Sequence, residues 1–383
     1  MSTVKTTNIT HGSNSGTSNI VLGSDGSVTF ASGAATGTEK GRNLIINGAM
    51  QVAQRGTSST DVGSPKTVDR WTYNENDSSG AATQSRVTDA PEGFGYSYKI
   101  ECTSANASPA ADVYNIIFTS FEGQDLQHIK KGTSNAQQLT ASFWVKGNAA
   151  ATYTCELRDH DNTRFCSQTF NVTTSWSRVT LTFAADTTGA FDNDNNLSMY
   201  LFIWLGGGSN YSGGTWTSNT WHTTDNKRIG DSTTNFFDST DRTFFLTGVQ
   251  LELGATATTF EHKSYADELV RCQRYYYRID AATNDYFGIG NIDGSNTGQI
   301  LVTFPIEMRV KPSSLDTTGT ASHYILRTTS NQTCTSVPTL SGHQTTKNAM
   351  LYFTKTSHGF TSGHGAFGRS NDNSSFLGFS AEL

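Results

Sequence analysis

The chain reads TGVQLELG at residues 247–254, where apolar and polar side chains alternate up to a glycine. Alternation with a period of two is typical of a half-buried β-strand, because successive side chains point to opposite faces of a sheet. A short polar link follows, and then an amphipathic segment that closes on Tyr275, Tyr276 and Tyr277. This stretch predicts a strand, a link and a short helix, and none of its residues indicates catalysis.

The segment after the link predicts the one clear helix of the chain. Ser264 is a suitable N-cap, and Asp267 follows three residues later, as in a capping box. One helical face carries side chains at i, i+4, i+7 and i+11, which are Tyr265, Leu269, Cys272 and Tyr276. We therefore expect a connecting helix within residues 263–279, between two β domains.

The rest of the chain consists mostly of short strand-like runs. Only 35% of the 383 residues are hydrophobic and 16% are charged, while Thr and aromatic residues are frequent. Branched and aromatic side chains fit a pleated, half-buried surface. The sequence predicts an all-β fold, an antiparallel sandwich with a smaller β domain after the helix. The run LFIWL at residues 201–205 lacks alternation, which predicts a central strand covered on both faces.

Shifts in composition divide the chain into an N-terminal segment, a sandwich, a connecting helix and a C-terminal β domain, at residues 1–42, 43–262, 263–279 and 280–383. In the N-terminal segment, Asp25 and Gly26 stand between apolar runs at residues 20–22 and 28–30, which is a hairpin signal. One such ribbon is not stable alone, so it needs further copies or a docking surface. The alternative is a disordered tail.

Charge and cysteine content limit the classes of partner. The formal net charge is −6 without a basic stripe, so we expect no binding to nucleic acid. No run approaches the ~18 apolar residues of a membrane-spanning helix, and no signal peptide is evident, which predicts synthesis in the cytoplasm and no membrane insertion. The five cysteines are an odd number. Cys155 and Cys166 flank a predicted turn at residues 159–162 and would lie opposite each other in a hairpin; we expect both to stay reduced.

Several motifs, taken in order, resemble those of bacteriophage tail-fibre or receptor-binding virion proteins. They are NLIING at residues 43–48 with Gln54 and Arg55, VDRW at 68–71, ASFWVK at 141–146, TGVQLELG at 247–254, FEH at 260–262, CQRYY at 272–276 and FSAEL at 379–383. The likeness covers residues 43–278 well and the rest loosely. It implies a jelly-roll-like sandwich similar to carbohydrate-binding modules, a homotrimer and a place in the virion.

The same resemblance implies partners and an interface. Residues 1–42 would attach the protein to other tail or virion proteins, and host surface polysaccharide would be the ligand. Tyr275, Tyr276 and Tyr277 would lie near a threefold axis. The alternative is that these three tyrosines pack only within one chain.

An aromatic-rich stretch at residues 209–222 is the candidate for a sugar-binding surface. It carries Tyr211, Trp216 and Trp221 among Ser, Asn, Gly and Thr. The C–H faces of sugars stack on aromatic rings while their hydroxyls pair with polar side chains, so such a surface binds without net charge. The alternative is that the two tryptophans face inward. We favour that alternative for Trp221 and expect Tyr211 to be exposed.

Three other chemistries are weaker candidates. The run DNDNN at residues 192–196 lacks the Gly and Glu of a calcium-binding loop, because Leu197 and Ile203 stand there, so we expect an Asx-rich turn. A trimer could trap a metal ion between His358 and His364, but we favour two exposed loop histidines. Glycoside hydrolysis needs a pair of carboxylates, and no spacing singles one out among Glu122, Asp125, Glu156, Asp159 and Asp161. We expect neither an enzyme nor a cofactor.

The sequence thus favours a homotrimeric phage fibre protein in the virion that attaches to host surface polysaccharide. Three copies would let weak contacts at single sites add up. The first alternative is a purely structural virion component, such as a head fibre or tail adaptor without receptor contact. The second is a polysaccharide depolymerase.

Overall fold

The computed structural model describes residues 8–9, 20–22, 28–30 and 41–383, and the chain divides into two compact units, residues 1–42 and 43–383. The first unit holds a three-stranded antiparallel sheet of β1 (Asn8–Ile9), β2 (Ile20–Leu22) and β3 (Val28–Phe30). Both strands of the predicted hairpin are therefore present. Its turn at residues 25–26 and most of the predicted attachment segment lie outside the described residues. No helix in the described ranges is long and apolar enough to span a membrane.

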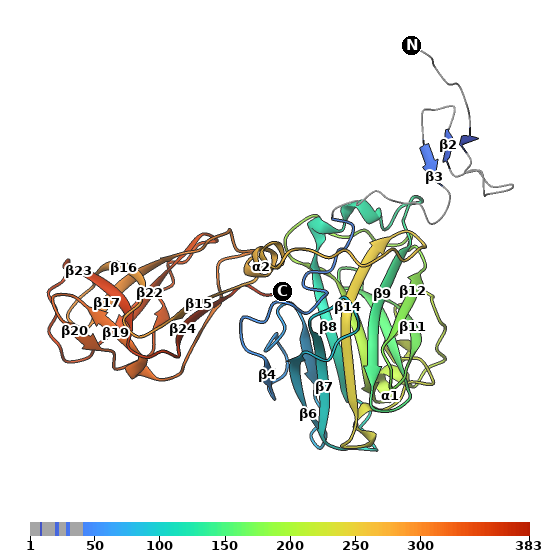
Figure 1. Cartoon of the computed structure of the whole chain (residues 1–383), viewed down its shortest axis with the longest axis horizontal. Coiled ribbons are helices and arrows are strands. Elements are labelled where there is room, and N and C mark those ends of the chain that lie inside the picture. Colours follow the sequence, from blue (N-terminus) through green and yellow to red (C-terminus); the bar gives the residue numbers. More distant parts are fainter. Residues whose placement is uncertain (1–7, 10–19, 23–27, 31–40) are drawn as a thin grey trace, which may run out of the picture. The chain divides into compact units, whose positions relative to one another are not determined.

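The second unit begins with eleven strands that make two antiparallel sheets (Figure 1). The strands are β4 (Ser58–Ser59), β5 (Thr72–Glu75), β6 (Ala81–Val87), β7 (Ser97–Ser104), β8 (Tyr114–Glu122), β9 (Leu139–Gly147), β10 (Ala151–Asp159), β11 (Arg164–Val172), β12 (Ser177–Phe183), β13 (Leu197–Gly207) and β14 (Thr243–Leu253). Their connections carry single helical turns at η1 (Gly123–Asp125), η2 (Gln127–Ile129), α1 (Ser209–Ser212), η3 (Asp225–Lys227) and η4 (Phe236–Asp238).

The two sheets share one hydrophobic core. The five-stranded sheet has the order β11-β10-β13-β8-β5, and the six-stranded sheet has the order β12-β9-β14-β7-β6-β4. Leu201 of β13 and Phe143 of β9 are fully buried members of this core, one from each sheet. The predicted all-β antiparallel sandwich is confirmed.

β13 lies in the centre of the five-stranded sheet, between β10 and β8. Its odd-numbered residues from Met199 to Leu205 enter the core, while its even-numbered residues from Tyr200 to Trp204 belong to a second cluster on the outer face. Tyr211 and Ile229, from the loops that cross this face, belong to the same outer cluster. The prediction of a central strand covered on both faces is therefore confirmed.

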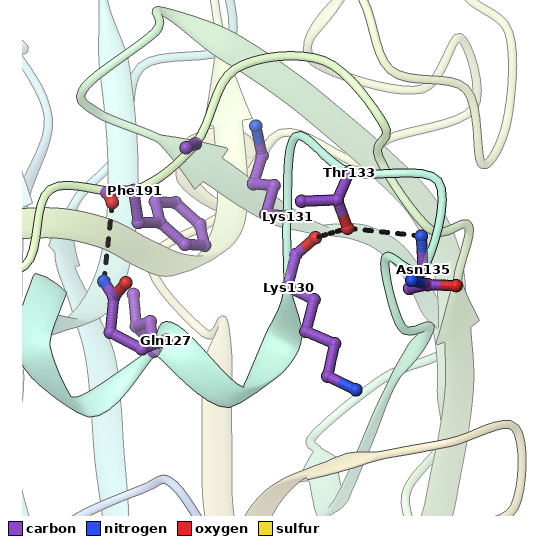
Figure 2. A pocket seen from close by; sticks show the side chains of 8 residues that line it. Gln127, Lys130, Lys131, Thr133, Asn135 and Phe191 are labelled. Carbon is purple, nitrogen blue, oxygen red and sulfur yellow. Dashed lines mark hydrogen bonds between the residues drawn. The ribbon is translucent and has the colours of Figure 1, made fainter.

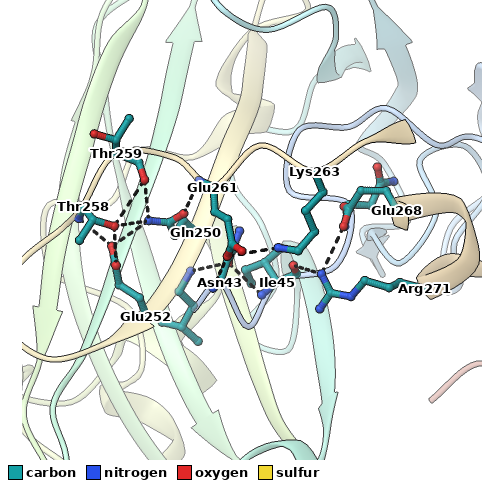
Figure 3. Close-up of polar contacts among 12 residues, drawn as sticks. Asn43, Ile45, Gln250, Glu252, Thr258, Thr259, Glu261, Lys263, Glu268 and Arg271 are labelled. Atoms are coloured by element: carbon teal, nitrogen blue, oxygen red, sulfur yellow. Dashed lines mark hydrogen bonds and ion pairs between the residues drawn. The ribbon is translucent and has the colours of Figure 1, made fainter. Parts of the chain in front are cut away.

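β14 contains the alternating stretch that opens the sequence argument, and its polar face is covered as well. A bulge between Thr247 and Gln250 shifts the register against β9, and Gly248 there has a φ of 60°, a conformation that favours glycine. Gln250 and Glu252 are buried beneath the link that follows the strand (Figure 3). The Oγ1 of Thr258 donates to Glu252 at 2.7 Å. The predicted strand is therefore present, and the polar link that follows it covers its polar side.

The NLIING motif at residues 43–48 fastens the start of the sandwich to β14. The Asn43 side-chain nitrogen Nδ2 donates to the Val249 carbonyl at 3.2 Å, and the side-chain oxygen Oδ1 accepts from Leu251 N at 3.1 Å. Gly48 runs so close to this strand that a Cβ would lie 2.1 Å from the Val249 oxygen. Asparagine and glycine are thus required by the contact with a strand about 200 residues further along the chain.

The C-terminal part forms a second β structure with its own core. A three-stranded sheet has the order β15-β24-β18 and a seven-stranded sheet the order β20-β19-β23-β16-β17-β22-β21. The elements are β15 (Tyr276–Ala281), β16 (Tyr286–Ile292), β17 (Thr297–Thr303), β18 (Ser314–Thr317), η5 (Ala321–His323), β19 (Tyr324–Arg327), β20 (Asn331–Thr333), β21 (Thr339–Leu340), β22 (Asn348–Thr354), β23 (Gly365–Ser370) and β24 (Ser375–Ser380). The predicted smaller C-terminal β domain is thus present, and the boundaries at residues 262 and 280 stay predictions.

The predicted connecting helix is α2 (Tyr265–Gln273). The Ser264 hydroxyl accepts from Asp267 N at 3.1 Å, which confirms the N-cap. The predicted helical face is only partly correct. Cys272 is fully buried, whereas Tyr265 is exposed. Tyr276 lies beyond the helix end, in β15, because the chain turns into the three-stranded sheet there.

Charged side chains tie the sandwich to the C-terminal part. Arg274 forms a bidentate ion pair with Glu122, with N–O distances of 2.8 and 2.7 Å. The Tyr275 hydroxyl donates to the same carboxylate. Arg70 pairs with Glu382 at 2.5 Å. Residues of the VDRW, CQRYY and FSAEL motifs therefore meet at this joint, where packing and charge account for their residue types.

Candidate functional site

A groove of about 240 Å³ lies on the outer face of the five-stranded sheet. Its lining is mostly aromatic and contains two arginines but no carboxylate; the residues are Asn74, Tyr114, Ile116, Phe118, Arg158, Tyr200, Phe202, Trp204, Tyr211 and Arg228. Phe202 and Trp204 are buried and form its floor, whereas Tyr114, Phe118, Tyr200 and Tyr211 are partly exposed. The groove therefore offers accessible ring surface and polar groups together.

The strand register builds this aromatic surface. Outward-facing residues of β13 stand beside outward-facing residues of β8, with Phe202 opposite Phe118 and Trp204 opposite Ile116. The rings of Tyr200 and Phe202 are stacked with centroids 4.9 Å apart, and Phe118 meets Tyr200 edge to face at 5.4 Å. Such contacts fix the orientation of each ring. The rings consequently form one ordered surface, in which each ring is held by its neighbours.

Tyr211 reaches the groove from α1, in the loop after β13. Its ring lies 5.2 Å from that of Trp204 and 6.3 Å from that of Tyr114. Its carbonyl accepts from Arg228 N at 3.0 Å and Ile229 N at 3.1 Å, so the two crossing loops hold each other. The structure places Tyr211 in the groove lining. The side chain is half-buried there, whereas we expected it to be exposed.

Arg228 is held in place by a buried ion pair. Its Nε and Nη2 donate to the two carboxylate oxygens of Glu156 at 3.0 and 2.7 Å. Its guanidinium carbon lies 4.9 Å from the Trp204 ring centre. Burial raises the pKa of Glu156 from its usual value, and the charge of Arg228 opposes that rise. Since this pair is compensated, Arg228 is chiefly a structural support of the groove.

Arg158 lines the same groove without such a partner. Within the described part of the chain its guanidinium has no hydrogen bond or ion pair with another residue, and its Nε is buried without an acceptor. Its guanidinium carbon lies 5.6 Å from the Tyr200 ring and 5.9 Å from the Phe165 ring. Burial, with the nearby charge of Arg228, lowers the pKa of Arg158 from its usual value. A guanidinium without a direct carboxylate contact among the described residues thus stands in an aromatic groove, with Glu156 and Asp225 acting on it only at longer range.

The two tryptophans of the predicted sugar-binding stretch lie outside the groove lining. The Trp216 indole donates to the Ser167 hydroxyl at 2.9 Å, and that of Trp221 donates to the Ala184 carbonyl at 2.7 Å. Trp221 packs against the sandwich core, as we favoured from the sequence. Of the predicted residues, only Tyr211 is brought into the groove. The sequence analysis missed the other rings of the groove. The aromatic residues at the even-numbered positions 200, 202 and 204 indicate such a surface, because alternate residues of a strand share one face.

The three consecutive tyrosines are packed within one chain. Tyr275 and Tyr276 are each 1% exposed. The guanidinium of Arg70 lies 3.5 Å above the Tyr275 ring, and that of Arg55 lies 3.5 Å above the Tyr276 ring. Tyr277 faces the C-terminal core, where it contacts Phe379 and Phe304, as their ring centroids lie 6.3 and 5.9 Å away. This arrangement is the alternative given above, and Tyr275 and Tyr276 leave no exposed surface for a threefold contact.

A second pocket, of about 410 Å³, lies beside η2 (Figure 2). Lys130 and Lys131 point in different directions there. The Lys131 ammonium is buried among Asp159 Oδ2 at 2.5 Å, Asp186 Oδ2 at 3.0 Å and the carbonyls of residues 188 and 189 at 2.7 and 2.8 Å. The oxygen ligands of this region are therefore satisfied by an ammonium group of the protein itself.

The remaining chemical candidates are accounted for by ordinary contacts. In the acidic run at 192–196, Asn196 N donates to Asp194 Oδ1 at 2.9 Å, so residues 194–196 form an Asx turn. The His358 ring stacks on Phe360 at 3.9 Å. Over the described ranges, no group of three or more His, Cys, Asp or Glu residues could hold a metal ion.

All five cysteines are buried and free. The expectation that Cys155 and Cys166 lie opposite each other is wrong. Cys155 stands opposite Gln168 and Cys166 opposite Leu157, because the register of β10 and β11 is offset by two residues from the one assumed. Burial raises the pKa of the Cys155 thiol well above its usual value.

Comparisons with known proteins find distant likenesses in structure only. Neither a protein-family model nor a curated protein matches the sequence. The enzymatically active domain of tailspike protein 4 from bacteriophage CBA120 is 10% identical with a TM-score of 0.30, over 55% of this chain and 21% of that chain. The family 11 carbohydrate-binding module of a Clostridium thermocellum cellulase is 13% identical with a TM-score of 0.26, over 52% and 99%. A tandem of family 22 modules from Paenibacillus barcinonensis is 11% identical with a TM-score of 0.26, over 89% and 98%.

Proposed function

We propose that this protein is a bacteriophage virion fibre protein that attaches the virion to polysaccharide on the host cell surface. The single observation that carries the binding part is the aromatic groove on the outer face of the five-stranded sheet. The sequence motifs within residues 43–278 support the virion part. Residues 1–42 then attach the protein to other tail or virion proteins.

A sugar chain suits this groove better than other ligands. The half-exposed rings of Tyr114, Phe118 and Tyr200 offer faces for the C–H surfaces of sugar rings. Asn74 and the tyrosine hydroxyls supply donors and acceptors beside those faces. Nucleic acid is a poor fit, because the chain carries a net charge of −6.

We propose binding without catalysis. Glycosidases place two carboxyl groups on either side of the scissile bond. The groove lining contains no Asp or Glu. Of the acidic residues singled out in the sequence, Glu156 pairs with Arg228 and Asp159 pairs with Lys131, so both are committed to internal cations.

The assembly in the proposal is a homotrimer, and the surface that supports it lies in the C-terminal sheet. Ile289 stands directly opposite Leu301 on β17 and Phe367 on β23, so the three side chains share one face. All three are exposed, with Ile289 at 62%. An exposed apolar row of this kind favours contact with another protein surface. The partner that we propose is a further copy of the same chain.

The proposal is tested by adsorption of the full-length protein to cells of a susceptible host. We expect saturable binding that blocks phage adsorption. The variant Y200A should lose this binding, because it removes a half-exposed ring of the groove, whereas Y265A, which removes an exposed tyrosine of α2, should retain it. Absence of saturable binding and of blocking favours a structural virion component. Release of reducing sugar from host polysaccharide favours a depolymerase.

A further inference from the structure

The guanidinium of Arg158 in the sandwich groove makes no direct hydrogen bond or ion pair with another described residue, and its Nε is buried. Arg158 and Arg228 are the charged residues of its lining. Arg228 is matched by the two-pronged contact with Glu156, and Asp225 Oδ1 lies 3.5 Å from its Nη1. Arg158 has no carboxylate partner among the described residues, although it is partly buried. A buried charge is costly unless it is paired, so an unpaired guanidinium of this kind favours an anionic group from outside.

The position of Arg158 fits an anion that is attached to a sugar. It shares the outward face of β10 with Glu156, two residues earlier, so both side chains stand on the same side of the sheet. Its guanidinium lies 5.6 Å from the Tyr200 ring. A sugar ring stacked on Tyr200 would therefore bring its substituents within reach of the guanidinium. Guanidinium groups bind carboxylates through two parallel hydrogen bonds, which adds specificity to affinity.

We propose that the groove selects acidic polysaccharides, and that Arg158 binds a carboxylate on a sugar that stacks beside it. This inference rests on the proposed sugar-binding role of the groove and adds the class of sugar, namely uronic acids or other carboxylated residues. The protein as a whole carries a net charge of −6, so general attraction to a polyanion is not expected. Recognition of an acidic chain must then come from the local cation.

The test compares one polymer backbone with and without its charge. Full-length protein is run in native gels that contain polygalacturonate or its methyl ester, in which the carboxylates are masked. We expect stronger retardation by the free acid. The variant R158Q should weaken binding to the free acid by roughly tenfold, the size of one charge-assisted hydrogen bond, and should remove the difference between the two gels. R158K should recover part of it, because it restores charge without the two-pronged geometry.

Two controls separate the outcomes. R327Q removes an arginine from the C-terminal sheet and should leave polysaccharide binding unchanged, and the melting temperature of R158Q should be no lower than that of the wild type, because the variant removes an unpaired, partly buried charge. Equal retardation in both gels, or a preference for the free acid that R158Q retains, would overturn the inference while the sugar-binding proposal stands. No retardation in either gel also contradicts the inference. The proposed function is then judged by the adsorption assay with Y200A, which does not depend on Arg158.

Discussion

Two outer sheet faces of this chain expose aromatic or apolar side chains, but they differ in shape and chemistry. On the sandwich, the rings of β13 and β8 form a groove that includes Arg158 and Asn74. On the C-terminal seven-stranded sheet, Ile289, Leu301 and Phe367 form a row in which aliphatic side chains dominate. Rings beside donors and cations suit a hydroxylated ligand, whereas an aliphatic row gains only from exclusion of water. On this difference rests our proposal that the first face binds the ligand and the second contacts protein.

The largest expected effect comes from removing the floor of the groove. W204A deletes a side chain that is 1% exposed at the centre of the outer cluster. We expect the free energy of unfolding to fall by about 3–5 kcal/mol, as for other buried aromatic truncations, with loss of polysaccharide binding. Urea denaturation measures the first effect. W176A, which truncates a half-exposed tryptophan in the turn before β12, should cost clearly less; equal costs would contradict a packed floor.

A smaller effect is expected at the joint that connects the two regions. Burial raises the pKa of Asp69 to about 6, although Arg55 and hydrogen bonds from Gln54 oppose the rise. A carboxyl group whose pKa is raised on folding stabilises the fold most below its unfolded pKa, near 4, and loses that contribution as the pH rises through about 6. We therefore expect this group to remove about 2–3 kcal/mol of stability between pH 4 and 7, at 1.36 kcal/mol per pKa unit.

The variant D69N isolates this contribution, because the amide does not titrate. The free energy of unfolding of each protein is measured by urea denaturation from pH 4 to 7. As the pH rises, the wild type should lose stability relative to D69N. Parallel curves would show that Asp69 does not titrate in this range and would contradict its burial as an acid.

The smallest effect on protomer stability is expected for the exposed row of Ile289, Leu301 and Phe367 on the C-terminal sheet. A variant of this row also tests the comparison most sharply. I289K places a charge on a side chain that is 62% exposed, so the free energy of unfolding should change by less than about 0.5 kcal/mol. We expect the solution mass to fall from that of a trimer to that of the 41.4 kDa protomer, while binding to host polysaccharide per site is unchanged. A wild-type protein that is monomeric at high concentration would contradict the assembly.

The sequence supported the fold well, because its signals are local. Alternation at residues 247–254, the unbroken run LFIWL and the Ser264 cap each depend on neighbours within a few residues. The features that were missed depend on distant contacts. The polar side of β14 is covered by a later link, and Tyr265 is exposed because the helix turns another face to the sandwich. Tyr275 and Tyr276 are buried by arginines about 200 residues earlier in the chain.

The site was harder to predict for the same reason. The tryptophans within a polar loop predicted a sugar-binding surface at residues 209–222, but only Tyr211 of that stretch lines the groove. The other rings come from β8 and β13, which meet only through the sheet register. Arg158 looks like an ordinary strand arginine in the sequence. Its lack of a partner becomes visible only when the positions of Glu156 and Arg228 are known.

The most direct test of the central claim is hydrogen–deuterium exchange of the full-length protein with and without purified host surface polysaccharide. The groove predicts added protection in peptides from β8, β13 and residues 209–229, and none in the strands β16, β17 and β23. Protection confined to the C-terminal sheet, or a polysaccharide that binds while β8 and β13 exchange unchanged, would contradict the assignment of ligand binding to the sandwich groove.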